Sequence, residues 1–258
     1  MSAYFIAVDL EGVALAVGSG PEAMGLGDNY HLACRQAVRE VNAAARALFD
    51  GGAERVVVWD NHGPSCNLDY EAVDPRCELL VGTGPAHRFC LLQEGFDGAL
   101  LIGYHAMDGT PGAVLAHSFS SRAYQGMWIG DRRVGEMAID GALAGEHGVP
   151  VILVVSDQAG CAEAQSFFGP IPTVATKRAL GWNMALCRHP DWVDQQVYQA
   201  ARQAMAAPKP APLRFPSPMV FTRRYKRINE LESDLKDGWE RVDAYTLRRT
   251  LASLTELY

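Results

Sequence analysis

The sequence predicts an α/β protein: a three-layer αβα sandwich around a mostly parallel sheet, followed by a smaller α+β part at the C-terminus. Short runs rich in apolar and β-branched residues alternate along the chain with segments of helical periodicity. These runs are apolar on both faces, which is typical of parallel strands covered by helices on both sides. Past residue 218 the chain becomes more charged and less regular, which indicates a separate, smaller part.

The elements follow in order from these patterns. The long amphipathic segment after the first apolar run stops at Asp50-Gly51-Gly52, a sequence that ends helices. The run VPVILVVS at 149–156 is the clearest buried strand. The expected strands are 4–8, 55–59, 79–81, 97–104, 149–156 and 219–222. The expected helices are 30–49, 134–146, 159–167 and 244–257.

A proline-rich segment, AAPKPAPLRFPSP at 206–218, indicates a linker or an extended connection. The sequence thus predicts an α/β domain at 1–205, the connection at 206–218 and a smaller C-terminal element at 219–258.

Composition excludes several classes of protein. The chain is 48% hydrophobic and 21% charged, as in a folded globular protein and unlike a disordered one. Its net charge is −7 and no basic stripe occurs, so we expect no nucleic-acid partner. No apolar run approaches the roughly 18 residues of a membrane helix, and the N-terminus lacks the features of a signal peptide. We therefore expect a cytoplasmic protein away from membranes, with its six cysteines reduced.

Metal-ligating residue types follow several of the expected strands. Asp9 and Glu11 come after the first strand, and His62 follows the second within DNH. His105 and Asp157 follow two later strands. Because the carboxyl ends of parallel strands meet at one edge of a sheet, we expect such side chains to lie close together.

Taken singly, each of these residues has an ordinary structural explanation. Asp9 and Glu11 suit the cap of a turn or a helix, and His62 lies in good turn chemistry. His105 fits the edge of a core, and Glu136 fits the first turn of a helix. Their coincidence at several strand ends favours a metal site. A mixed imidazole and carboxylate set suits Zn²⁺, and also Mn²⁺ or Co²⁺.

Other candidates are weaker. No Gly-x-Ser-x-Gly elbow surrounds Ser118, which disfavours a serine hydrolase. Asp60 is placed to orient His62. The histidines without a strand-end position are expected at the surface or in structural roles; they are His31, His87, His147 and His189.

The motifs VDLEG, DNH, GYHA, TPG…HS and VGE occur in this order and spacing between residues 4 and 190, and in this the chain resembles the D-aminopeptidase family of zinc metallopeptidases, M55. The resemblance implies two zinc ions per subunit. It implies that Asp9, Glu11 and His62 hold one ion. It likewise implies that Asp9, His105 and Glu136 hold the other, with Asp9 bridging.

The resemblance also gives His117, in VLAHSFS, the catalytic role, usually framed as that of a nucleophile. From chemistry alone we favour a general acid/base, because a histidine takes and gives a proton near neutral pH. The sequence leaves both roles open.

The function implied is a zinc-dependent aminopeptidase that hydrolyses the amide bond of an N-terminal residue, of D configuration, in short peptides or amides. Two alternatives remain. The segment after His117 is rich in bulky and cationic side chains, which suits a metal-dependent amidase acting on a non-peptide aryl or small-molecule amide; they are Phe119, Arg122, Tyr124 and Trp128. The second alternative is a metal-binding module without turnover, which the intact ligand set disfavours.

The resemblance finally implies a homo-oligomer, a decamer of two pentameric rings that enclose the active sites. In that arrangement residues 1–205 supply the catalytic domain, and residues 219–258 contribute to substrate binding or assembly.

Overall fold

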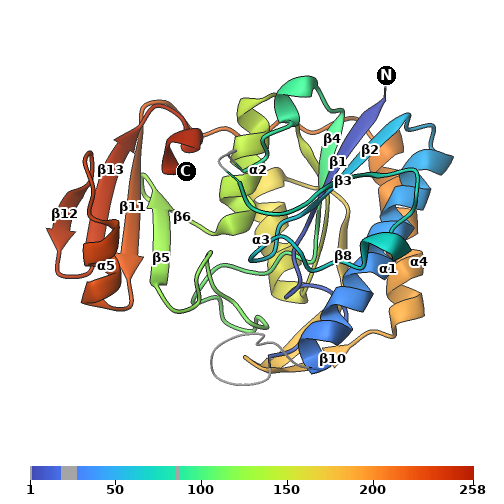
Figure 1. The fold of residues 1–258 in the computed structure, drawn as a ribbon, viewed down its shortest axis with the longest axis horizontal. Helices are drawn as coiled ribbons and strands as arrows, with labels where there is room; N and C mark the ends of the chain where they lie inside the picture. Colours follow the sequence, from blue (N-terminus) through green and yellow to red (C-terminus); the bar gives the residue numbers. More distant parts are fainter. Residues whose placement is uncertain (1, 19–27, 85–87) are drawn as a thin grey trace.

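Six parallel strands form the central sheet within the residues that the computed structural model describes, 2–18, 28–84 and 88–258 (Figure 1). Their order is β3-β2-β1-β4-β7-β8. The strands are β1 Ala3–Val8, β2 Arg55–Asp60, β3 Glu78–Leu80, β4 Gly98–Ile102, β7 Val151–Ser156 and β8 Thr173–Ala175. Each neighbouring pair is parallel, which confirms the predicted sheet.

The strand β1 shows why this sheet is buried on both faces. All six of its residues are buried. Because side chains alternate along a strand, Tyr4, Ile6 and Val8 pack into one apolar cluster. Phe5 and Ala7 pack into a second cluster on the opposite face. A strand covered on both faces, as β1 is, therefore requires an unbroken run of apolar residues.

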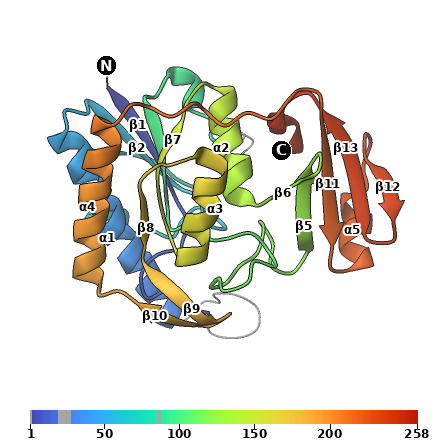
Figure 2. The ribbon, with the colours of Figure 1, turned by 180° about the vertical axis from the view of Figure 1, so that it is seen from behind.

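Helices cover both faces and complete three layers (Figures 1 and 2). Helices α1 (Asp28–Asp50) and α4 (Pro190–Ala206) pack against each other on one face. Helices α2 (Glu136–Glu146) and α3 (Gln158–Phe168) supply apolar residues to the cluster on the other face. The predicted helices 30–49, 134–146 and 159–167 correspond to α1, α2 and α3. Two short 3₁₀ helices lie in the connections, η1 Tyr70–Ala72 and η2 Leu92–Glu94.

A second, antiparallel sheet lies beyond α2, in the order β12-β13-β11-β5-β6 (Figure 1). Its strands are β5 Tyr124–Ile129, β6 Arg132–Val134, β11 Met219–Tyr225, β12 Glu240–Asp243 and β13 Thr246–Leu251. Helix α5 (Ile228–Asp234) and the 3₁₀ helix η3 (Leu254–Leu257) complete this part. The smaller α+β part is thus present, and it draws two strands from the middle of the chain.

The predicted C-terminal helix at 244–257 is wrong. Leu247, Leu251 and Leu254 stand at helical spacing, but the segment forms β13 and then η3. Strand β13 pairs with both β11 and β12, so its backbone groups are satisfied by the sheet. Tertiary pairing overrides the local periodicity here.

The segment between α4 and β11 contains no helix or strand and crosses from one side of the molecule to the second sheet (Figure 2). Leu213 and Phe215 within it pack against the apolar cluster between the parallel sheet and helices α2 and α3. A division into domains at 206–218 stays a prediction. Among the residues described, no helix combines the length and apolar character needed to cross a bilayer.

Three elements that precede this segment in the chain were not predicted from the sequence. Helix α4 begins at Pro190, with the side chain of His189 capping it. Strands β9 (Lys177–Gly181) and β10 (Met184–Cys187) form an antiparallel hairpin that follows β8 directly.

The strand order reverses between β1 and β4. The chain proceeds from β1 to β2 and β3 in one direction, then returns to β4, β7 and β8 on the other side. In open α/β sheets, ligands bind beyond the carboxyl ends of the strands at such a reversal.

Candidate metal centre

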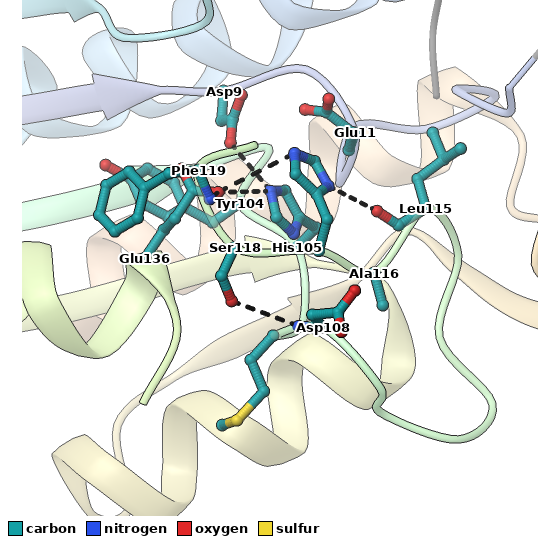
Figure 3. A network of polar contacts seen from close by, with 12 residues as sticks. Asp9, Glu11, Tyr104, His105, Asp108, Leu115, Ala116, Ser118, Phe119 and Glu136 are labelled. Atoms are coloured by element: carbon teal, nitrogen blue, oxygen red, sulfur yellow. Dashed lines mark hydrogen bonds and ion pairs between the residues drawn. The ribbon is translucent and has the colours of Figure 1, made fainter. Parts of the chain in front are cut away.

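The predicted ligands gather at the point of reversal. Asp9 directly follows β1, His62 follows β2 and His105 follows β4. These three strands are neighbours in the sheet, so their carboxyl ends deliver the three side chains to one place. Glu136 joins them as the first residue of α2. Figure 3 shows the carboxylates of Asp9 and Glu136 reaching the ring of His105, with the side chain of Glu11 close by.

Asp9, Glu11 and His62 form the first group. His62 Nδ1 lies 2.8 Å from Asp9 Oδ1 and 3.2 Å from Glu11 Oε2. Asp9 and Glu11 are both nearly inaccessible to solvent. Glu11 Oε2 makes no hydrogen bond within the described residues, which is costly for a buried carboxylate.

His105 and Glu136 form the second group, and Asp9 joins it to the first. His105 Nε2 lies 3.3 Å from Glu136 Oε1 and 3.6 Å from Asp9 Oδ2. The other ring nitrogen, Nδ1, lies 3.0 Å from the carbonyl oxygen of Ala106. Because a carbonyl only accepts, this contact places the proton of neutral His105 on Nδ1 and leaves Nε2 to face the carboxylates.

His117 lies against the second group. Its ring stacks on that of His105, with centroids 4.0 Å apart. Its Nδ1 lies 2.7 Å from the carbonyl oxygen of Leu115, so the neutral ring carries its proton there and presents Nε2 as an acceptor. That Nε2 is 3.9 Å from Glu136 Oε1. His105, His117 and Glu136 are close enough together to share one ion.

Burial and the charges of neighbouring side chains strongly shift the pKa values of these carboxylates. Burial and the neighbouring carboxylate of Glu11 raise the pKa of Asp9 to about 7. Burial would raise the pKa of Glu136, but the hydrogen bond and positive charge of His105 lower it to about 2. Burial also raises the pKa of Glu11, yet the charge of His62 outweighs it and holds this pKa well below its usual range.

The histidines show the complementary effect. Burial opposes the charged form of His105, but Glu136, Glu11 and Asp9 raise its pKa to about 10. Glu11 and Asp9 likewise outweigh burial at His62, whose pKa lies well above its usual value. His117 differs, because burial and the positive charge of His105 lower its pKa. Three buried carboxylates thus demand positive charge at this spot.

Asp60 and Asp157 have roles other than those that the sequence indicated. Asp60 does not touch the ring of His62. Its carboxylate accepts hydrogen bonds from the backbone N–H groups of Asn67 and Leu68 and from the hydroxyl of Tyr70, and so fixes the loop after His62. Asp157 caps α3 by accepting from Gly160 N, and it accepts from Val114 N as well.

The bulky and cationic side chains that follow His117 are divided between the centre and the second sheet. Tyr124 and Trp128 belong to β5 of the second sheet. Arg122 is exposed. Phe119 stays at the centre, where its backbone N–H donates to Glu136 Oε1.

A buried polar network behind the centre was missed by the sequence reasoning. The Arg88 guanidinium forms a bidentate pair with Asp140, at 2.8 and 2.6 Å. The hydroxyl of Tyr104 donates to Asp140, and Asn61 Nδ2 donates to that hydroxyl. One signal was available: Asp140 stands four residues after Glu136, on the same face of α2.

Of the remaining histidines, those that the structure describes lie outside the centre. His147 ends α2, and the side chain of His189 caps α4. The ring of His31 packs edge-on against Tyr30. His87 lies outside the described residues.

Comparisons with known proteins all point to one family. A family model of the M55 peptidases, described as D-aminopeptidase, matches residues 2–258. A curated D-aminopeptidase of Bacillus subtilis (strain 168) is 31% identical over 194 residues, and the match covers 72% of this chain and 67% of that protein. A solved structure, described as "Zn-dependent D-aminopeptidase DppA from Bacillus subtilis, a self-compartmentalizing protease", matches with a TM-score of 0.88 and 26% identity. That match covers 98% of this chain and 93% of the other. The chain therefore belongs to the D-aminopeptidase family of peptidases.

Proposed function

We propose that this protein is a zinc-dependent aminopeptidase that hydrolyses the amide bond after an N-terminal residue, of D configuration, in short peptides or amides. The observation that carries the proposal is the convergence of five ligating side chains, four of them buried and His62 half-buried, together with His117 at one edge of the parallel sheet. Family membership and the zinc dependence stated for the solved relative support it.

The donor set fits two divalent cations. Asp9, Glu11 and His62 would hold one ion; Asp9, His105 and Glu136 would hold the other. Carboxylate oxygens and imidazole nitrogens are ligands of Zn²⁺, and they also accept Mn²⁺ and Co²⁺. Glu11 Oε2, which accepts no hydrogen bond and lies 3.2 Å from His62 Nδ1, is an oxygen that such an ion would satisfy. When bound, the metals would polarise the substrate carbonyl and activate a water molecule.

His117 would move the proton. Its neutral ring offers Nε2 as a base, because Nδ1 is bonded to the carbonyl of Leu115. Burial lowers its pKa, which favours the neutral form at physiological pH. From Nε2 the proton would pass to the leaving amine. We assign His117 as general acid/base; a nucleophilic role would require a covalent adduct on Nε2.

The assembly and the compartment form part of the same proposal. The solved relative is described as self-compartmentalizing, which supports a homo-oligomer, a decamer in the form predicted from the resemblance. All six cysteines are unpaired, which supports a reducing, cytoplasmic location.

Metal removal and a substrate panel test the proposal together. Exhaustive chelation should abolish hydrolysis, and zinc should restore it as about two equivalents bind. The panel compares D-alanyl and L-alanyl p-nitroanilides, D-amino acid amides and aryl amides. Full activity after chelation would contradict the metal mechanism, and a preference for aryl amides would indicate a non-peptide substrate. Metal binding without turnover of any amide would indicate a binding module.

A further inference from the structure

Lys177, the first residue of β9, is buried against the loop that carries Glu11. It is only 2% exposed, and no carboxylate within the described residues pairs with it. Its ammonium group instead donates to three backbone carbonyls, at 2.5 Å from Glu11 O, 2.7 Å from Val13 O and 2.7 Å from Ala16 O. These contacts use all three of its N–H donors.

Burying the ammonium group of Lys177 in this way lowers the stability of the protein unless its hydrogen bonds compensate for the lost water. Moving an ammonium group out of water without a counter-ion has a large desolvation cost, which only well-aligned hydrogen bonds offset. A methionine would fill much the same volume without that cost. The three carbonyls belong to one short stretch, residues 11–16, which wraps around Lys177 Nζ. Lys177 therefore fixes the shape of this stretch.

Neighbouring contacts hold the same loop at its other residues. The hydroxyl of Thr176 donates to Gly12 O at 2.6 Å, and Ala14 N donates to Glu40 at 2.8 Å. At Gly12 a Cβ atom would lie only 2.0 Å from Tyr104 O, so the loop packs directly on the backbone after β4.

We propose that Lys177 is a positioning residue for the metal centre, which holds the backbone of Glu11 so that the carboxylate of Glu11 reaches the site shared by Asp9 and His62. The inference rests on the proposed function. Asp9 is held independently, because its N–H donates to Ile102 O. His105 and Glu136 come from other elements. Loss of Lys177 should therefore weaken the ion at Asp9, Glu11 and His62 and spare the ion at His105 and Glu136.

Charge and geometry predict opposite effects, which makes the inference testable. A buried ammonium repels a nearby cation, so removing its charge alone would tighten zinc binding. Removing the hydrogen bonds that hold residues 11–16 would instead weaken zinc binding. In Lys177→Met we expect zinc affinity at one of two sites to fall by about tenfold or more, the usual scale for residues that orient metal ligands.

The experiment is a zinc titration of metal-free protein against a chromophoric chelator, repeated with Co²⁺ to record the absorption of each site. Lys209→Met is the matched control, since it removes a lysine that pairs with Asp97 at the surface. Wild-type affinity or tighter binding at both sites in Lys177→Met would overturn the inference. A wild-type protein that binds no zinc would instead overturn the proposed function.

A double-mutant cycle separates positioning from general destabilisation. In a Glu11→Gln background, Lys177→Met should weaken zinc binding no further, because the carboxylate that it positions is gone. An equal loss in both backgrounds would refute the positioning role. If Lys177→Met does not fold, Lys177→Gln takes its place in the cycle, because its shorter side chain has only two donors and cannot reach all three carbonyls, so zinc binding at one site should still weaken.

Discussion

Asp9 joins the two halves of the centre, since its two oxygens face different histidines. Its raised pKa shows that a second negative charge beside Glu11 is unfavourable in this buried place without a cation. The raised pKa favours a metal-binding role for the acid pair in VDLEG over that of a turn cap. His117, by contrast, contacts the centre from outside the predicted ligand set.

Single substitutions should separate these two roles. Asp9→Ala removes the shared ligand, so we expect metal content to fall and activity to disappear with it. His117→Ala should keep both metals and lose most activity, by at least about a hundredfold, the usual contribution of acid/base catalysis. Metal analysis and steady-state kinetics on both variants are the measurements. Loss of one equivalent in His117→Ala would make it a ligand, and full turnover would remove its catalytic role.

Glu40 allows a pH prediction away from the ligands. It is fully buried, and burial raises its pKa from 4.5 to about 7 despite the attraction of Lys177; Asp194 adds to the rise. Its Oε1 accepts from Ala14 N and from Gln36, while Oε2 has no hydrogen bond within the described residues. The folded state thus holds the proton more tightly than the unfolded state. Its contribution to stability is present below pH 4.5 and is lost as pH rises through about 7.

Glu40→Gln should remove this dependence, since glutamine keeps the acceptor for Ala14 and does not ionise. The variant and the wild type should be equally stable near pH 4.5. At pH 8 the variant should be more stable by up to about 3 kcal/mol, at about 1.4 kcal/mol per pKa unit. Denaturant unfolding of both proteins across this range is the measurement. A stability difference that does not change with pH would contradict it.

The sequence predicted which side chains meet at the sheet edge better than it predicted their surroundings, and the reason is physical. Asp9, His62 and His105 follow parallel strands, so knowing the strands is enough to bring them together. Asp157 also follows a strand, but its carboxylate caps α3. Lys177 was not predicted, because a cation bound by carbonyls leaves no pattern of charges in the sequence.

At the scale of elements, α2 connects the centre to the buried network behind it. Glu136 begins this helix, and Asp140 lies one turn further along the same face. The helix is buried almost throughout, so its polar side chains need partners. Arg88 and Tyr104 provide them for Asp140.

Asp140→Ala should therefore be strongly destabilising. It leaves the mostly buried guanidinium of Arg88 without a counter-ion, a loss of about 3–5 kcal/mol. The double variant Arg88→Met with Asp140→Leu removes both charges and should recover much of that loss. Denaturant unfolding of the three proteins measures it. Equal losses in the single and double variants would show that packing, not charge, dominates.

Five of the six parallel strands were predictable because they are continuous apolar runs, and helices α1, α2 and α3 were predictable from helical patterns between these runs. Strands β5 and β13 were not predicted, since both carry polar residues and their pairing does not show in their own sequence. One edge of β5 pairs with the adjacent β6, but the other pairs with β11, about ninety residues later. Short strands such as β8 lack enough residues to show a period.

At the scale of the whole molecule, the second sheet packs through a shared apolar cluster against α2, which covers the parallel sheet. Phe221 of β11 and Leu251 of β13 pack into the same apolar cluster as Met137 of α2. The C-terminal part therefore supports the helix that begins with Glu136. The match to the solved relative over 98% of this chain includes both parts.

Assembly is the prediction that belongs to this scale. Four large apolar side chains of the β9–β10 hairpin are exposed: Leu180 at 53%, Trp182 at 37%, Met184 at 64% and Leu186 at 60%. Adjacent exposed apolar groups are unusual on a monomer and favour association. We expect light scattering coupled to size exclusion to give a decamer, about ten times the 28.0 kDa of one chain. If the assembly encloses its active sites, turnover should fall steeply as peptide substrates lengthen, because long chains enter a compartment slowly. A 28.0 kDa particle with full activity would contradict the assembly, and equal cleavage of short and long peptides would contradict the enclosure.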